Sequence, residues 1–203
     1  SMPRGTPQGC RPSGGRMNPA FTLKLPADEA SLKRVKAGDR VVLSGSIYVA
    51  RDAAHRRIID ALDKRKPLPF SLRGQTIYYM GPAPARPGQL IGSAGPTTSG
   101  RMDVYTPPLL AEGLKVMIGK GERSGAVKKA IKKYRAVYLA AIGGAGALIS
   151  KCVKKSEIIA YPELGAEAVL RLEIDDFPAV VVNDIYGGDL YVAGKAKYRR
   201  ALP

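Results

Sequence analysis

Hydrophobic and polar positions follow two different periods along the chain, and the changes of period predict its strands and helices. Alternating or continuous apolar runs predict strands at residues 21–26, 40–50, 76–80, 115–119, 136–142, 157–161, 168–174 and 179–182. Apolar residues at helical spacing predict helices at residues 28–32, 51–66, 103–113 and 126–134, and a further helix opened by residues 143–146. Two strands lie close together near each end of the chain. This order favours an α/β fold with a mixed sheet flanked by helices.

The periodic pattern begins only at Phe21. Residues 1–20 contain three arginines, several glycines and prolines, and no acidic residue. The Ser-Met opening resembles a cloning remnant, and Met17 could be an internal start. We therefore predict a disordered or cloning-derived arm over residues 1–20 and one domain over residues 21–203, which is long enough to bury a full core. The basic stretch over residues 195–200 is expected to be an exposed tail.

Composition narrows the class of protein. Apolar residues make up 45% of the chain, an ordinary share for a globular protein, and no run approaches the ~18 consecutive apolar residues of a membrane span. Cys10 and Cys152 are too few for a disulfide framework, so we expect a cytoplasmic protein in a reducing environment. They are also too few to hold an iron–sulfur cluster, so this chain is expected to bind no metal by itself.

The net charge of +16 fits either nucleic-acid binding or attraction of a small anion or an acidic partner. A helix around residues 126–134 carries an apolar stripe that includes Ala126, and its lysines fall on the opposite face. These lysines are Lys128, Lys129, Lys132 and Lys133. We interpret them as a solvated face, because the aromatic residues are not interleaved with basic ones as a base-stacking platform requires. Nucleic-acid binding stays open only as a minor alternative.

The long connection after the strand at residues 76–80 is the first candidate site. It is rich in Gly, Pro, Ala, Ser and Thr and contains no Asp, Glu or Lys until it ends at Arg101. A loop of this length inside a compact domain is either functional or disordered. We interpret it as an ordered loop whose backbone amides and hydroxyls, together with Arg86 and Arg101, hold an anion.

Two further cations follow predicted strands. Arg51 begins a helix, with Asp52 beside it and His55 one turn later, and a helix N-terminus already favours an anion. His55, the only histidine, fits a hydrogen-bonded supporting position as well as a direct role. Lys120 follows a short buried strand, where ligands of open α/β sheets bind. The glycine-rich turn over residues 143–146 is a weaker anion site, because close helix packing explains it equally well.

These residues suit binding more than a complete reaction. The sequence has no Ser-His-Asp order, no cluster of histidines and cysteines for zinc, and no P-loop. Arginine offers a two-pronged donor for a carboxylate, so Arg51, Arg101 and Lys120 together suit a small dicarboxylate.

Six motifs, in order, make a resemblance specific. They are RDAAH (51–55), YYMGPAPA (78–85), GSAGPTTSGRMD (92–103), IGKG (118–121), AIGGAGAL (141–148) and VVNDIYGG (181–188). This set resembles the β subunit of iron–sulfur hydro-lyases, the class I fumarate hydratases and the related L-tartrate dehydratases. The likeness extends over nearly all of residues 21–191 and leaves residues 1–20 unmatched.

The resemblance implies a swivelling β/β/α domain and a partner α subunit whose cysteines hold a four-iron four-sulfur cluster, a Lewis acid toward the substrate. It implies a heterotetramer of two α and two β subunits. By motif, Arg51, Arg101 and Lys120 would bind the substrate carboxylates, and Thr97 matches the proposed catalytic base. A threonine is a poor base unless cations lower its pKa, so Thr97 could instead only hydrogen-bond the substrate.

We therefore expect the β subunit of a class I fumarate hydratase, which adds water reversibly to fumarate to give malate. Asp52 and His55 are expected to orient Arg51, and Thr98 is a further supporting candidate. The alternatives are an L(+)-tartrate dehydratase β subunit and, from another class, a non-catalytic basic module that binds nucleic acid.

Overall fold

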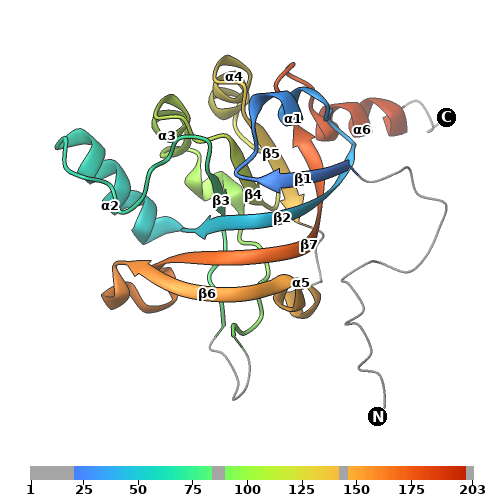
Figure 1. Cartoon of the computed structure of the whole chain (residues 1–203). Helices are drawn as coiled ribbons and strands as arrows, with labels where there is room; N and C mark the ends of the chain where they lie inside the picture. Colours follow the sequence, from blue (N-terminus) through green and yellow to red (C-terminus); the bar gives the residue numbers. More distant parts are fainter. Residues whose placement is uncertain (1–20, 84–89, 142–145, 200–203) are drawn as a thin grey trace, which may run out of the picture.

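The computed structural model describes residues 21–83, 90–141 and 146–199 (Figure 1). The strands are β1 (Phe21–Leu25), β2 (Arg40–Val49), β3 (Thr76–Tyr78), β4 (Val116–Gly119), β5 (Val137–Ala141), β6 (Val153–Ala160) and β7 (Val169–Asn183). The α-helices are α1 (Glu29–Lys33), α2 (Asp52–Asp63), α3 (Thr106–Ala111), α4 (Gly125–Lys133), α5 (Gly146–Cys152) and α6 (Leu190–Arg199). Two short 3-10 helices are η1 (Ser99–Met102) and η2 (Pro162–Glu167). The predicted mixture of strands and helices is confirmed.

The strands form one mixed sheet that closes on itself. Strands β1 to β5 pair in parallel with their neighbours in chain order. Strand β7 runs antiparallel to both β5 and β2, so β2, β3, β4, β5 and β7 form a closed ring. Strand β6 extends the sheet beyond β7, and β1 extends it beyond β2. The mixed sheet was predicted, but its closure was not.

Two cores lie on opposite faces of the ring strands. Alternate residues point into the ring, where Tyr78, Ile118 and Leu139 belong to one buried cluster. Their neighbours Met117 and Tyr138 belong to a second cluster on the outer face. Strands β3, β4 and β5 are therefore covered on both faces, which explains why they read as continuous apolar runs in the sequence.

The outer cluster is completed by α2, α3 and α4. Each helix contributes an apolar stripe, with Ile58 from α2, Leu109 from α3 and Ile131 from α4 fully or almost fully buried. Ser124 caps the N-terminus of α4, because its side chain accepts a hydrogen bond from the Val127 N–H. The sheet is thus flanked by helices on this side, as predicted (Figure 1).

The lysine face of α4 needs two corrections. Ala126, expected in the apolar stripe, is exposed. Lys128, expected in solvent, is only 26% exposed in its side chain and pairs with Asp189 at 2.7 Å and Glu122 at 2.9 Å. Lys129, Lys132 and Lys133 are exposed as predicted. The sequence could not show that the start of α6 brings an acid to this helix.

The end of the chain also differs from the sequence prediction. Residues 168–174 and 179–182 belong to a single strand, β7, and not to two. Asp175 and Asp176, between the two predicted strands, sit where the β2–β7 register shifts, and Asp176 has a φ of 52°. Residues 195–200 were expected to form an exposed tail; as far as Arg199 they belong to helix α6 instead. The expected arm over residues 1–20 lies outside the described residues.

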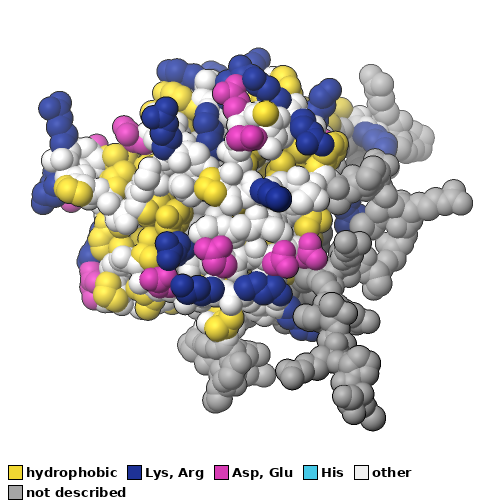
Figure 2. Space-filling model, in the orientation of Figure 1, with side chains coloured by type: hydrophobic (Ala, Val, Ile, Leu, Met, Phe, Trp, Pro, Cys, Tyr) yellow, Lys and Arg dark blue, Asp and Glu magenta, His cyan; other side chains and the backbone are white. Residues whose placement is uncertain are grey.

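Charges of both signs share the visible face. Figure 2 shows Lys and Arg side chains spread over the molecule, with acidic side chains between them over β6 and β7. There Arg171 pairs with Glu157 at 2.9 Å.

None of the described helices is long and apolar enough to cross a membrane.

Gly45 supplies a test of the close approach of β2 to β1. Its φ is 129°, and an added Cβ would collide with the carbonyl oxygen of Leu25 in β1. We expect Gly45→Ala to lower the free energy of unfolding by at least about 2 kcal/mol, measured by urea denaturation. Gly125→Ala is the control, because nothing lies within 4 Å of its Cβ at the start of α4. Equal stability of the two variants would contradict this account.

Candidate anion-binding site

The predicted site residues gather where three neighbouring parallel strands end. Arg51 follows β2, and Lys120 follows β4. The segment Thr97–Arg101 returns beside β3 and β4: the Thr97 N–H donates to the Tyr79 carbonyl oxygen at 2.8 Å, and Thr98 forms a parallel bridge with Lys120. Ligands of parallel α/β sheets bind at such strand ends. The strand-end positions predicted for Arg51 and Lys120 agree with the structure.

Arg101 connects two of the predicted residues. Its Nη2 donates to Thr97 Oγ1 at 2.7 Å and to Asp52 Oδ2 at 3.0 Å. The Arg101 side chain is 52% exposed, so the rest of the guanidinium is accessible to a ligand. We expected Asp52 to orient Arg51, but its carboxylate contacts Arg101 instead.

Arg51 is held by a residue that sequence reasoning missed. Its Nη2 lies 3.1 Å from Glu167 Oε1, and the other carboxylate oxygen of Glu167 accepts the Ala53 N–H at 2.7 Å. The guanidinium lies directly against Gly81, where a Cβ would collide with it. Glu167 thus caps α2 and orients Arg51 at once. No local signal identifies it, because it comes from η2, more than a hundred residues away in sequence.

His55 supports the backbone of Arg51. It is fully buried against the rings of Tyr79 and Tyr105, and its Nδ1 lies 3.0 Å from the carbonyl oxygen of Arg51. Burial is the main reason why the pKa of His55 is lowered from 6.5 to about 4. The imidazole is therefore neutral near pH 7, with Nδ1–H as the donor. This is the hydrogen-bonded supporting position that the sequence allowed.

Ser99 links the two loop segments of the site. Its N–H donates to the Lys120 carbonyl oxygen at 2.9 Å, and the Lys120 N–H donates back to Ser99 Oγ at 3.1 Å. The hydroxyl occupies the space that a side chain at residue 119 would need, so only Gly119 fits there. This pair of bonds ties the segment of Thr97 to that of Lys120, whose own side chain is exposed.

Other predicted features lie elsewhere. Arg86, Cys10 and the first three residues of the turn over 143–146 fall outside the described residues. Cys152 is fully buried at the end of α5. Within the described ranges, no group of three or more His, Cys, Asp or Glu side chains could hold a metal ion. The donor set of this part of the chain therefore does not fit an iron–sulfur cluster.

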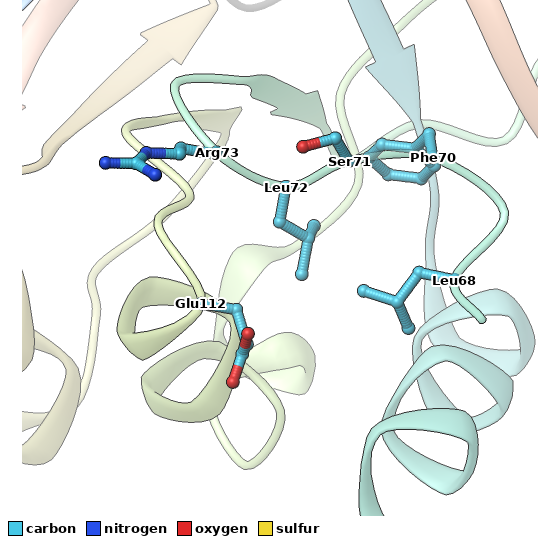
Figure 3. A pocket seen from close by; sticks show the side chains of 6 residues that line it. All are labelled: Leu68, Phe70, Ser71, Leu72, Arg73 and Glu112. Carbon is cyan, nitrogen blue, oxygen red and sulfur yellow. The ribbon is translucent and has the colours of Figure 1, made fainter. Parts of the chain in front are cut away.

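A surface pocket of about 310 Å³ lies between the α2–β3 connection and the end of α3 (Figure 3). Leu68, Phe70 and Leu72 line it together with Ser71, Arg73 and Glu112. None of the predicted site residues lines it. Its geometry gives no reason to move the candidate site away from the strand ends.

Fold and site together define a class: a barrel-like α/β domain with arginine and lysine side chains at the ends of its parallel strands. The sequence profile described as "Fumarase C-terminus" matches residues 10–194. The chain therefore belongs to the fumarase C-terminal family, as the motifs predicted.

Individual relatives support the same family assignment. The chain is 43% identical to fumarate hydratase 2 of Leishmania major over 83% of this chain and 30% of that protein. It is 39% identical to the aerobic class I fumarate hydratase of Escherichia coli strain K12 over 91% of this chain and 34% of that protein. The chain thus spans about a third of the length of these enzymes.

A third relative has a similar length to this chain. It is a Methanocaldococcus jannaschii protein with the provisional name L(+)-tartrate dehydratase subunit beta. The identity is 39% over 79% of this chain and 85% of that protein.

His55 predicts a pH dependence of stability. Its pKa is about 4 in the folded chain and ~6.5 when unfolded, so between these values the unfolded chain binds more protons. The stability contribution is complete above pH 6.5 and decreases toward pH 4. We expect urea denaturation to show a loss of about 2 kcal/mol from pH 7 to pH 5. In His55→Asn, which removes the only histidine, this part of the loss should disappear. An unchanged pH dependence would contradict the assignment.

Proposed function

We propose that this chain acts as the β subunit of a class I fumarate hydratase and, with a partner α subunit, hydrates fumarate reversibly to malate. The observation that carries the proposal is the convergence of Arg51, Arg101, Lys120 and Thr97 at the ends of three neighbouring strands. Membership of the fumarase C-terminal family supports the same reaction.

The three cations suit the two carboxylates of a small diacid. Arg101 uses one nitrogen, Nη2, for both Thr97 and Asp52, which leaves its other edge for a carboxylate. Arg51 is about one quarter exposed beside Gly81, and the Lys120 side chain is exposed at the end of β4. Guanidinium groups bind carboxylates in a two-pronged geometry, and an ammonium adds a point charge.

Thr97 is the proposed base. A guanidinium has no acceptor, so Thr97 Oγ1 must accept the hydrogen bond from Arg101. The hydroxyl hydrogen then points away from Arg101 and is free to meet the substrate or a partner group. A cation that donates to this oxygen also favours its deprotonated form.

In this proposal the iron–sulfur cluster belongs to the α subunit, as the family resemblance implies. When bound there, the cluster supplies a Lewis acid to the substrate. The proposal includes two α and two β subunits, a swivelling role for this domain, and a cytoplasmic location. This chain would contribute the carboxylate-binding side of a shared site.

A second substrate has one specific observation in its favour. The relative of similar length carries a tartrate dehydratase β-subunit name. L(+)-tartrate differs from malate by one hydroxyl, so the same cations would bind both carboxylates of either substrate. The assay below includes both.

The test of the reaction is anaerobic hydration of fumarate, followed by the loss of its ultraviolet absorbance. The chain is assayed alone and with its cluster-loaded partner. The same samples are then given L(+)-tartrate, and its dehydration is measured. Activity only in the mixture, with fumarate as the preferred substrate, is expected. Activity of the isolated chain, or none with either diacid in the loaded complex, would overturn the proposal.

Arg101→Lys tests the guanidinium. The substitution keeps the charge but removes the fork, so we expect the KM for fumarate to rise about tenfold or more. Arg73→Lys is the matched control, since Arg73 lies at the pocket of Figure 3 and not at the strand ends. Substrate affinity equal in both variants would remove Arg101 from the site.

Thr97→Ala tests the base. Loss of a general base lowers turnover by about a hundredfold or more, with a smaller change in KM. Thr22→Ala, at an exposed position of β1, is the control and should keep full activity. A Thr97→Ala enzyme that loses affinity but keeps kcat would show that the hydroxyl only binds the substrate.

A further inference from the structure

A buried arginine lies beneath the candidate site. Arg123, in the connection from β4 to α4, has a side chain with no exposed surface. Its Nε donates to Asp103 Oδ1 at 2.7 Å, and its Nη2 donates to Thr106 Oγ1 at 2.7 Å. An arginine is almost never fully buried unless it is paired, and removing one partner of such a pair is costly. The sequence offered no sign of it, because Arg123 sits in a run of basic residues that resembled a solvated surface.

Two tyrosines enclose this guanidinium. The Arg123 Cζ lies 5.2 Å from the ring centroid of Tyr79 and 4.9 Å from that of Tyr138. Its Nη1 also lies 3.4 Å from the Tyr79 hydroxyl. Cation–π contacts of this kind are strongest where water is excluded, as it is here. Arg123 therefore contacts both tyrosine rings through its guanidinium group.

Tyr138 links Arg123 to the candidate site. Its hydroxyl lies 2.9 Å from Ser99 Oγ and 2.9 Å from the carbonyl oxygen of Gly121. Ser99 Oγ in turn accepts the Lys120 N–H. A continuous chain of contacts thus runs from Arg123 through Tyr138 to the backbone of Lys120.

Asp103 makes a second connection between the same two segments. It follows η1, which contains Arg101, and its Oδ2 accepts the Ser124 N–H at 2.6 Å. Its Oδ1 accepts from Arg123. The segment that carries Thr97 and Arg101 is therefore fastened at Ser99 and again at Asp103 to the segment that carries Lys120.

We propose that Arg123 and Tyr138 are positioning residues, which set the segment of Thr97 and Arg101 against that of Lys120. They contact no substrate in this account and act through Ser99 and Asp103. The inference rests on the proposed function, since it concerns the same site. Displacement of a catalytic group by about 1 Å can cost a hundredfold in rate, so such fastening bears directly on activity.

Tyr138→Phe removes the hydroxyl and leaves the ring over Arg123. In the cluster-loaded complex, we expect kcat/KM for fumarate to fall about fivefold or more, the effect of one lost hydrogen bond. Tyr48→Phe is the matched control and should keep full activity, because the Tyr48 ring stacks on Phe70, which lines the pocket of Figure 3. Ser99→Ala removes the same contact from the other side, together with the acceptor of the Lys120 N–H, and replaces Tyr138→Phe if that variant does not fold.

Amide hydrogen exchange supplies a readout that needs no catalysis. In the full chain, Tyr138→Phe should speed exchange at the amide of Lys120 and leave β6 unchanged. Faster exchange together with lower kcat/KM is the expected result. Unchanged exchange at Lys120 overturns the proposal, and a lower melting temperature with unchanged kcat/KM reduces the network to a structural role.

The two proposals fail in different ways. If the wild-type complex neither hydrates fumarate nor dehydrates tartrate, the proposed reaction fails. The exchange measurement then still decides whether Tyr138 orders the two segments. If the wild type is active and Tyr138→Phe matches it in both measurements, only the positioning role fails.

Discussion

The pairing of β7 with β2 is the constraint on which the rest of the structure depends. It joins residues such as Arg40 and Val180, which lie far apart in sequence, and so closes β2, β3, β4, β5 and β7 into a ring. Closure gives the strands an interior core and leaves an outer face for the helices. Because β2, β3 and β4 are parallel neighbours in this ring, their carboxyl ends must meet at one rim. The position of the candidate site follows from that.

The strand ends alone do not fix the positions of the site residues. The cations stand on irregular segments between regular elements, where backbone order must come from side chains. Glu167 supplies it at Arg51, and the buried Arg123 with Tyr138 and Ser99 supplies it at Lys120. Preorganised groups on rigid supports are what an anion-binding site requires. The supporting residues are therefore as much a part of the site as the cations.

The sequence predicted the parts of this molecule that depend on local pattern. Periodicity located most of the strands and helices, and the motifs identified Arg51, Thr97, Arg101 and Lys120, which the structure brings to one rim. The partners missed were distant in sequence. Nothing near residue 51 indicates that it pairs with Glu167. The single strand β7 was predicted as two for a related reason, because only the register with β2 shows that the strand continues.

The carboxylates of Glu167 and Asp52 affect the entropy cost of ligand binding. Arg51 is paired with Glu167, and Arg101 with Asp52, by the protein's own fold. A long side chain that is already fixed by such a pair has lost much of its rotamer freedom before any ligand arrives. The entropy cost of ordering these arginines is then part of the folding free energy and not of the binding free energy. A small diacid would meet a site whose disorder has largely been removed in advance.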